Sequence, residues 1–595
     1  MVVGNHFWNI IGVIALLCSY HLGSTQPQIT WEKKVDSTLL QEMTGNGEAD
    51  FLVYFNEQPD LSGEVKVDWT KSRKGHYVLS TLRQHATTSQ RDIVNYLNSK
   101  QIPYSSLFIV NIVKTRGNLT LIKELALREE VKYIMVNPSI MLDFGESSRD
   151  YQSLRAEQWG IGMINADKVW EMGIKGEGIV IGGQDTGYEW DHPALKTKYR
   201  GYISKDEVEH NYNWHDAVHE INPLHEDVDP DPSVNPCGLD IMAPCDDHNH
   251  GTHTMGTMVG SAEGFDIGIA PDAKWCGCRN MDRGYGSPFT YLECFQWFLA
   301  PTDLEGMDPD PGMSPHVITN SWACPPMEGC SPATFEVLNT AVKNLKLAGI
   351  VVVVSAGNNG SDCSTVSSPA AIFDDSFTVG AVADNDTIAR FSSRGPVISD
   401  ASNRTKPNVV APGVRVLSSI KEGEYREFSG TSMAGPHVSG VVALILNANP
   451  QLEGKVDIIE DIIESTAVPK TSNQDCGDIS GTIVPNNTYG YGRIDALAAV
   501  EEAISLIVGP KDIVDSVIEV YPNPVENILN FGLEYLEDDV NLELFDINGR
   551  QIYHRSWYNQ YRSTTTIDVT DLSSGLYIYR IRSDDFTWQG KVVKY

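Results

Sequence analysis

Positive charge is scarce in this chain. Its 595 residues include 45 lysines and arginines but 79 aspartates and glutamates, which gives a formal net charge of −34 at pH 7. A chain this acidic offers no basic surface to DNA or RNA, so we expect no nucleic-acid partner. Hydrophobic residues still make up 41% of the chain, which excludes global disorder and predicts large cores.

Long hydrophobic runs are also missing. The one candidate, Phe7–Tyr20, is too short for a comfortable membrane span of about 20 residues. Small polar residues follow it up to Thr25, which predicts a secretory signal peptide over residues 1–25. The alternative is a retained anchor, because no Lys or Arg precedes the apolar run. We therefore expect a secreted protein, extracellular or at the cell surface.

Cysteine is absent from most of the chain. Apart from Cys18 in the expected signal peptide, all nine cysteines lie between Cys237 and Cys476. Export favours disulfides, although spacing alone does not fix their connectivity. The candidate pairs are Cys237/Cys245, Cys324/Cys330, Cys363/Cys476, and Cys294 with either Cys276 or Cys278. One of the nine thiols must stay unpaired, and Cys276 is the candidate. A zinc site is disfavoured because Cys276-Gly-Cys278 has no matching second pair of ligands.

The first 145 residues predict a small α+β unit. The expected strands are 50–55, 107–113 and 131–136, and the expected helices are 83–100 and 119–129. This βαββαβ-like order favours a sheet with helices on one face, over residues 30–145.

Residues 150–508 predict an α/β domain. Continuous β-branched strand runs alternate with apolar helices such as 438–446, which argues for a parallel sheet with helices on both faces. The strand runs are 178–182, 316–319 and 349–355. An acidic, proline-containing insertion without Lys or Arg occupies residues 216–247.

The last segment predicts a small all-β sandwich. A linker is expected at 510–516, and residues 517–595 then show short alternating runs broken by Asn, Gly and Ser. Asn548-Gly549 is a strong hairpin signal.

The first motif with chemical potential is Asp185-Thr186-Gly187, directly after the strand run at 178–182. An acid at the carboxyl end of a parallel strand lies where α/β sheets place their sites, although it can also simply cap a turn. An aspartic protease is disfavoured, because that chemistry needs two carboxylates and no second Asp-Thr-Gly or Asp-Ser-Gly exists.

Two further motifs follow along the chain. Residues 248–257 (HNHGTHTMGT) are rich in histidine but lack the His-Glu-x-x-His zinc signature, so base chemistry and a structural role compete. Residues 430–437 (GTSMAGPH) lead into an apolar helix and place Ser432 at its start. Backbone N–H groups and the helix dipole there favour negative charge, whereas an isolated serine would be only an N-cap.

Together the three motifs predict nucleophilic catalysis. A hydroxyl needs a base to take its proton, a neutral histidine can do so near pH 7, and a buried carboxylate can hold the imidazole tautomer. Along the chain, Asp185, His250 and Ser432 follow one another in the order in which subtilisin carries its catalytic Asp, His and Ser.

On these motifs the chain resembles the subtilisin-like serine proteases (subtilases). Further matching stretches are 355–360 (SAGNNG), 391–396 (FSSRGP), 406–413 (KPNVVAPG) and 490–496 (GYGRIDA). The long spacing from Asp185 to His250, the cysteine pairs and the run CRNMDRG are similar to the bacillopeptidase F-like branch.

The resemblance implies roles for single residues. Asp185, His250 and Ser432 form the triad, and the Asn358 side chain and the Ser432 N–H hold the oxyanion. His253 is expected to be structural. The substrate-binding strand would contain Ser321, Trp322 and Ala323. Trp322 and Ala323 are uncommon in the family at these positions, so the resemblance does not assign the primary specificity.

The resemblance extends to both ends of the chain. Residues 30–145 resemble the family's inhibitory propeptide, with a maturation cut expected between about Leu142 and Gln158; the alternative is an unrelated α+β module. The end of the chain resembles the type A sorting domain of type IX secretion, on the motifs YPNP at 521–524, LFDINGRQIY, LSSGLYIYRI and KVVKY; the alternative is a binding module.

The chemistry itself requires no cofactor. Structural calcium is an expectation, because subtilases commonly bind it and the acidic insertion offers hard oxygen ligands, with a solvated acidic loop as the alternative. The oxygens are those of Asp227, Asp229, Asp231, Asp246 and Asp247, and no ligand set is assigned.

The sequence therefore predicts a secreted serine endopeptidase, made as an autoprocessed precursor. Its partners would be protein or peptide substrates, its own propeptide as inhibitor, and the type IX secretion machinery. The alternatives are a processing protease of narrow specificity and a non-catalytic surface protein that uses the same fold for binding.

Because His250 must be neutral to act as a base, we predict that activity rises through about pH 6–7. The measurement is a pH–rate profile of the mature enzyme on a peptide substrate. A profile that stays flat from pH 5 to 8 would contradict this assignment.

Overall fold

The computed structural model describes most of the chain, and none of the helices in that part is long and apolar enough to cross a membrane. The expected signal peptide and the linker at 510–516 lie outside the described residues. Those residues are 31–43, 47–142, 147–150, 158–225, 236–262, 265–507, 518–533, 538–546, 549–559, 563–582 and 587–595.

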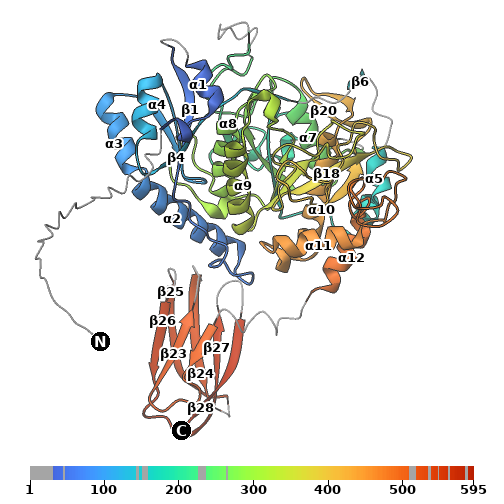
Figure 1. The fold of residues 1–595 in the computed structure, drawn as a ribbon. Helices are drawn as coiled ribbons and strands as arrows, with labels where there is room; N and C mark the ends of the chain where they lie inside the picture. The colour runs from blue at the N-terminus through green and yellow to red at the C-terminus, as the bar shows by residue number, and fades with distance from the viewer. Residues whose placement is uncertain are drawn as a thin grey trace, which may run out of the picture.

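A seven-stranded parallel sheet forms the centre of residues 158–507 (Figure 1). Its spatial order is β10 (Trp214–Asp216), β13 (Lys274–Arg279), β7 (Val180–Asp185), β16 (Val317–Asn320), β17 (Val351–Ser355), β18 (Phe377–Val382) and β19 (Val409–Pro412). The predicted parallel sheet is thus confirmed, with each strand run shifted by two residues at most at its start.

Both faces of this sheet are buried, as continuous apolar strands require. Val351 and Val353 pack into one core with α7 (His250–Val259) and α10 (Thr431–Ala448). Val352 and Val354 pack into a second core with α8 (Pro288–Leu299) and α9 (Pro332–Leu347). Successive strand residues point to opposite faces, so one run of valines serves both cores.

The N-terminal unit is an antiparallel sheet with helices on one face. The strand order is β2 (Tyr104–Leu107), β3 (Ile112–Gly117), β1 (Ala49–Phe55), β4 (Val131–Val136). α1 (Ser37–Glu42), α3 (Arg91–Lys100) and α4 (Leu119–Ala126) cover one face, whereas α2 (Lys71–Ser89) joins the core on the other side and contacts α9. The predicted helix at 83–100 is in fact two helices, of which α2 starts earlier.

The single strand predicted at 107–113 is wrong, because the chain turns between β2 and β3. Asn111 is buried at that turn, where its backbone N–H donates to the side chain of Gln58 at 2.9 Å and its amide donates to Glu57 O and Ser89 Oγ. These partners lie more than 20 residues away along the chain. A local apolar pattern could not reveal the turn, since distant groups stabilise it.

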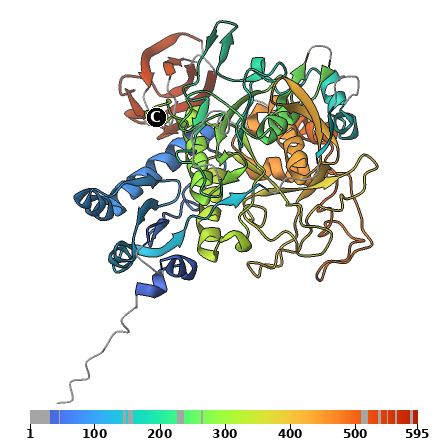
Figure 2. The same cartoon turned by 90° about the horizontal axis from the view of Figure 1, so that it is seen from above.

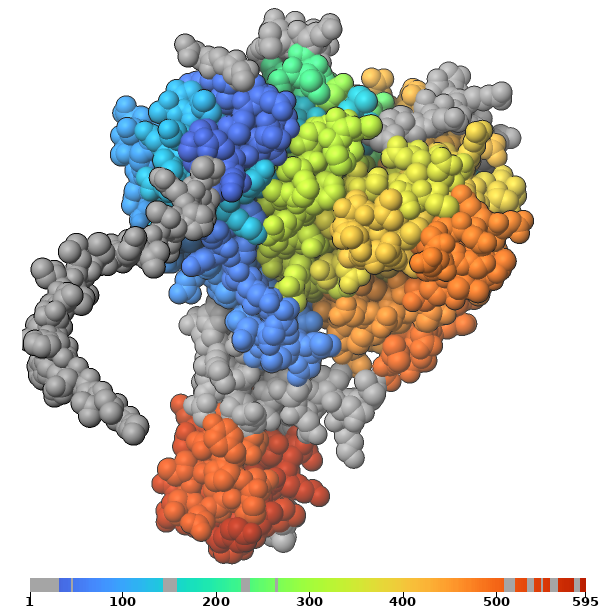
Figure 3. Space-filling view, in the orientation of Figure 1, coloured from blue at the N-terminus to red at the C-terminus, as the bar shows by residue number. Residues whose placement is uncertain are grey.

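The other face of this sheet packs on the α/β domain. Phe51, Val53 and Phe55 enter the unit's own core, whereas Leu52 and Tyr54 join the core formed with α8 and α9. Figures 1 and 2 show the blue N-terminal elements beside these green helices, and Figure 3 shows the two surfaces in contact. The unit therefore cannot leave without exposing apolar side chains.

Polar contacts reinforce the same interface. Gln296 Oε1 on α8 accepts hydrogen bonds from the backbone of Phe108 and Ile109, and Asn344 on α9 donates to Ile109 O at 2.8 Å. The buried ammonium groups of Lys71 and Lys74 donate to Ser314 O and Gly454 O, each at 2.7 Å. Burial lowers the pKa of Lys71 to about 8, which indicates a tightly enclosed contact.

The C-terminal segment is the predicted all-β sandwich. One sheet has the order β22 (Ile518–Tyr521), β23 (Ile528–Leu533), β26 (Ser563–Asp568), and the other β25 (Gln551–Asn559), β24 (Asp538–Phe545), β27 (Gly575–Arg582), β28 (Thr587–Lys594). Phe531 and Leu542 of the two sheets meet in one core. β24 and β25 pair antiparallel across the predicted hairpin, whose Asn548 lies outside the described residues.

Eight of the nine expected cysteines form disulfides. The pairs are Cys237–Cys245, Cys278–Cys294, Cys324–Cys330 and Cys363–Cys476. Cys276 is the remaining thiol and is buried. The structure thus resolves the choice for Cys294 in favour of Cys278 and confirms the other three pairs.

A buried carboxylate on α8 fixes the start of the acidic insertion. Glu293 Oε1 accepts from His215 Nε2 at 2.9 Å and from His219 Nε2 at 2.8 Å, and His219 Nδ1 contacts Asp240. Burial alone would raise the pKa of Glu293, but the two histidine hydrogen bonds outweigh it and lower that pKa to about 2. Burial likewise opposes the charge on His219, but its hydrogen bonds to Glu293 and Asp240 raise its pKa to about 9.

This cluster predicts a pH-dependent contribution to stability. The part from His219 is complete below its ordinary pKa of 6.5 and is lost as the pH rises through about 9. The part from Glu293 is complete above its ordinary pKa of 4.5 and is lost as the pH falls toward about 2. We expect Glu293→Gln to lower the melting temperature most near pH 5–6 and least near pH 9.

The measurement is thermal unfolding from pH 5 to 9 in a Ser432→Ala background, which prevents the expected self-digestion. Glu336→Gln, which removes a half-exposed carboxylate on α9, is the matched control. A difference between wild type and Glu293→Gln that stays constant over this range would refute the histidine contribution.

Candidate active site

Asp185 and His250 form a buried pair. Asp185 ends β7, and His250 begins α7, the helix that packs against this strand. His250 Nδ1 lies 2.7 Å from Asp185 Oδ1, and the two side chains are 1% and 4% exposed. A carboxylate accepts only, so it binds the Nδ1–H tautomer of the ring and leaves Nε2 as the basic nitrogen.

Glycine allows the close approach of these two segments. A Cβ on Gly251 would lie 2.0 Å from Gly187 O, and Gly187 itself has φ +103 with a Cβ position 1.8 Å from Cys245 O. A larger residue at position 251 would push α7 away from the end of β7, and one at position 187 would push away the segment of Cys245 and Asp246.

Ser432 lies in the first turn of α10, as predicted. The helix begins at Thr431 after Gly430, and it packs along α7 and across β16 to β19. Pro436 has no N–H, so the carbonyl of Ser432 receives no helical hydrogen bond from it. Ser432 is 4% exposed. Its hydroxyl therefore lies at a helix N-terminus, where a developing negative charge is stabilised.

Asn358 lies beside the start of α10. Its Oδ1 accepts from Thr431 N at 2.9 Å and from Thr431 Oγ1 at 3.0 Å. Both bonds use the carbonyl side of the amide, which fixes the orientation of the N–H donors of Asn358.

A cavity of about 220 Å³ lies beside the start of α10. Ser432 and Asn358 line it together with the three predicted substrate-binding residues Ser321, Trp322 and Ala323, which follow the carboxyl end of β16. The remaining wall includes Met327 and Glu328 from the short loop closed by Cys324–Cys330. Trp322 is nearly buried and stacks on Tyr291, with 4.0 Å between the ring centroids, and this stacking fixes the shape of the cavity wall.

Two other histidines near the site hold the backbone. His253 Nε2 lies 3.0 Å from both Val416 O and Arg426 O, and burial lowers its pKa to about 3. His437 contacts Met433 O and Gln158, and burial lowers its pKa to about 4. Buried, neutral rings that contact backbone carbonyls fit the structural role predicted for His253.

The N-terminal unit reaches the cavity with its last strand. β5 (Ile140–Met141) pairs antiparallel with β15 (Tyr285–Gly286), and Leu142 N donates to Gly284 O at 2.8 Å. Met141 lines the cavity that Ser432 borders. The next described strand, β6 (Ser147–Asp150), pairs with β21 (Glu424–Phe428), which leads directly to Ser432. Met141 and the partner strand of β6 therefore both lie near the segment that carries the nucleophile.

The sequence did not predict the segments that pair with the chain beside this cavity. The hairpin of β14 (Met281–Asp282) and β15 lies outside the three catalytic motifs, and its role comes from its pairing with β5. The loop of Met327 and Glu328 was likewise missed, although the spacing of Cys324 and Cys330 signals a closed loop.

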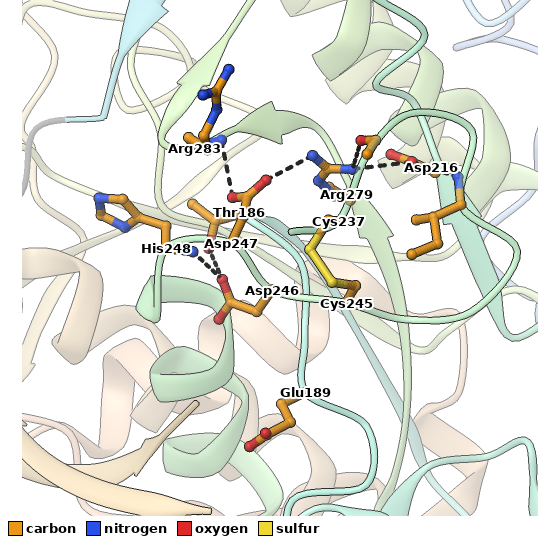
Figure 4. Close-up of a disulfide and its surroundings, with 12 residues drawn as sticks. Thr186, Glu189, Asp216, Cys237, Cys245, Asp246, Asp247, His248, Arg279 and Arg283 are labelled. Atoms are coloured by element: carbon orange, nitrogen blue, oxygen red, sulfur yellow. Dashed lines mark hydrogen bonds and ion pairs between the residues drawn. A yellow bond between two sulfur atoms is a disulfide. The ribbon is translucent and has the colours of Figure 1, made fainter. Parts of the chain in front are cut away.

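Protein groups surround the side chains of Asp246 and Asp247, two of the five acids named for the calcium expectation. Their oxygens accept hydrogen bonds from protein donors, and Asp247 also forms an ion pair with Arg279 at 2.7 Å (Figure 4). Within the described ranges, no group of three or more His, Cys, Asp or Glu residues could hold a metal ion. Asp227, Asp229 and Asp231 lie outside those ranges.

Comparison with known proteins decides the family. Residues 176–492 match the Subtilase family, and residues 519–595 match a secretion system C-terminal sorting domain. The chain belongs to the subtilase family. It is 34% identical to bacillopeptidase F of Bacillus subtilis (strain 168) over 505 residues, which are 79% of this chain but only 32% of that protein.

Two further relatives match this chain over most or all of their own length. A thermophilic serine proteinase of Bacillus sp. (strain AK1) is 29% identical over 75% of this chain and 92% of its own length. The crystal structure of an epidermin leader peptide processing serine protease from Staphylococcus aureus, a serine-to-alanine mutant, superposes with a TM-score of 0.55 at 17% identity. It covers 77% of this chain and all of that one, which establishes a shared fold.

Proposed function

We propose that this subtilase is a secreted serine endopeptidase with Asp185, His250 and Ser432 as its triad. The observation that carries the proposal is the water-excluded pair of Asp185 and His250 at the carboxyl edge of a parallel sheet where α10 delivers Ser432. Ser432 also borders a cavity beside a backbone segment that can pair with an extended peptide.

The proposed reaction passes through an acyl-enzyme. His250 Nε2 takes the proton of Ser432 Oγ as this oxygen attacks the carbonyl carbon of a bound peptide. The Asn358 side-chain N–H and the Ser432 backbone N–H stabilise the oxyanion. His250 then gives the proton to the leaving amine, and a water molecule repeats the sequence to release the acid, while Asp185 holds the ring and stabilises the imidazolium.

Every step uses groups of the chain and a water molecule, so the proposal includes no cofactor in the chemistry. A structural calcium ion in the acidic insertion remains a prediction for Asp227, Asp229 and Asp231. Thermal unfolding with and without a calcium chelator would test it.

Residues 31–142 act in this proposal as an inhibitory propeptide. Support comes from the shared core with α8 and α9, and from β5, which occupies the edge that a substrate strand would use. Within the predicted range of Leu142 to Gln158, we propose that the maturation cut falls between Leu142 and Ser147; the pairing of β5 with β15 and of β6 with β21 supports this choice.

The sorting domain at 519–595 supports export. We propose that the precursor enters by a signal peptide at residues 1–25 and crosses the outer membrane with the type IX machinery. The mature enzyme would then act outside the cell on protein or peptide substrates.

The first test compares wild type and Ser432→Ala, both expressed in an exporting host. We expect the wild type to react with a fluorophosphonate probe and to be shortened to a new N-terminus between residues 143 and 147, because the triad cuts its own propeptide. Ser432→Ala should neither react nor be shortened. N-terminal sequencing and fluorescence of the labelled band are the measurements. Complete processing without labelling would instead favour a non-catalytic binding protein cut by another enzyme.

The second test concerns the oxyanion. Asn358→Ala should lower kcat by about 100- to 1,000-fold and leave KM nearly unchanged, because the lost N–H stabilises only the oxyanion. Steady-state hydrolysis of a chromogenic peptide measures both constants. Thr431→Ser, which keeps the hydroxyl that binds Asn358 Oδ1, is the matched control. An equal loss in both variants would point to a disturbed helix start instead of a lost donor.

A further inference from the structure

Asp246 lies where the chain segments that carry Asp185 and His250 come together. Its side chain is 5% exposed, and it precedes His250 by four residues. Neither the triad nor the oxyanion site uses it. Its hydrogen bonds nevertheless involve both segments, so its role can be read from its five donors.

One oxygen joins the loop after β7 to the start of the α7 segment. Asp246 Oδ1 accepts from Thr186 Oγ1 at 2.9 Å and from His248 N at 2.8 Å (Figure 4). It also accepts from Asn249 N at 3.0 Å. Thr186 directly follows Asp185, and Asn249 directly precedes His250. The same oxygen therefore contacts the chain next to each member of the pair.

The other oxygen holds the first turn of α7. Asp246 Oδ2 accepts from Thr252 N at 3.0 Å and from Thr252 Oγ1 at 2.6 Å. A carboxylate at a helix start is favoured by the exposed N–H groups and the dipole there. The orientation of the turn that carries His250 is thus set by Asp246.

Thr186 extends the contact to the catalytic residues themselves. Its hydroxyl accepts from Gly251 N at 3.0 Å, and its backbone N–H donates to Asp185 Oδ1 at 2.8 Å. Asp185 Oδ1 is the oxygen that faces His250 Nδ1. A continuous set of hydrogen bonds therefore runs from Asp246 through Thr186 to both sides of the buried pair.

The surrounding backbone keeps Asp246 in place. Gly187 forms an antiparallel bridge with Asp246, Tyr188 N donates to Cys245 O at 3.1 Å, and Cys245 is bonded to Cys237. The neighbouring Asp247 turns the other way, toward Arg279 and the backbone of Arg283 (Figure 4). The two adjacent carboxylates thus bind different segments, and only Asp246 contacts the segments that carry Asp185 and His250.

We propose that Asp246 is the positioning residue that sets the geometry of the Asp185–His250 pair, an inference that rests on the proposed endopeptidase function. Its two oxygens accept five hydrogen bonds. One donor is the hydroxyl of Thr186, and the other four belong to the first turn of α7 or to the two residues before it. An amide cannot replace it, because the NH₂ group of asparagine would face an N–H or O–H donor on one side.

The main test is Asp246→Asn, matured in trans by tagged wild-type enzyme that is then removed. We expect kcat to fall by about 100-fold with KM within about twofold, since a displacement of a catalytic group by about 1 Å has that cost. Asp216→Asn is the matched control, because Asp216 is a buried carboxylate of the same region that binds Arg279 and Ile241 N. It should lower the melting temperature while kcat and KM stay unchanged.

A second pair of variants covers the case in which Asp246→Asn does not fold. Thr186→Val removes the hydroxyl that joins Asp246 to Gly251 N and should lower kcat at constant KM. Thr186→Ser keeps the hydroxyl and should recover most of that loss, which a role in packing alone would not produce.

The outcomes separate this inference from the proposed function. Wild-type kcat in folded Asp246→Asn, or in Thr186→Val, overturns the positioning role while an inactive Ser432→Ala protein leaves the endopeptidase in place. Cleavage of the same peptide by Ser432→Ala at the wild-type rate overturns the proposed function and this inference with it.

Discussion

The hydrogen bond between His250 Nδ1 and Asp185 Oδ1 imposes the strictest demand on this structure. It must be short and shielded from water, although one partner ends a central strand and the other begins a helix 65 residues later. Gly187 and Gly251 allow the two segments to touch, and Asp246 joins them from the side. The sheet supplies a rigid edge, but the glycines and the buried carboxylate decide whether the two side chains meet.

The two faces of the sheet in the N-terminal unit pack into two different hydrophobic cores. Leu52 and Tyr54 enter the core shared with α8 and α9, whereas Phe51 and Val53 enter the core of the unit itself. This division follows directly from the twofold alternation of side chains along a strand. The apolar face that holds the unit in place is therefore also the face that it would expose if it were released.

The parallel sheet and the start of α10 could be predicted from the sequence, because both depend on local patterns. Runs such as 349–355 are apolar throughout, and Gly430 with Ser432 marks a helix start. The turn at Asn111, the wall formed by β15 and the role of Asp246 depend on partners far along the chain. Asp246 illustrates the difference: the sequence shows only an acidic loop, whereas folding brings five protein donors to the oxygens of this one side chain. Residue type alone does not reveal which group will satisfy a carboxylate.

β5 pairs with β15, and the next described strand, β6, pairs with β21, which precedes Ser432. In the proposed precursor the bond to be cut belongs to the same chain as the nucleophile, so its effective concentration does not depend on dilution. Its cleavage would follow first-order kinetics, with a half-life that does not change on dilution. A precursor secreted at very low concentration could thus mature as quickly as one that accumulates.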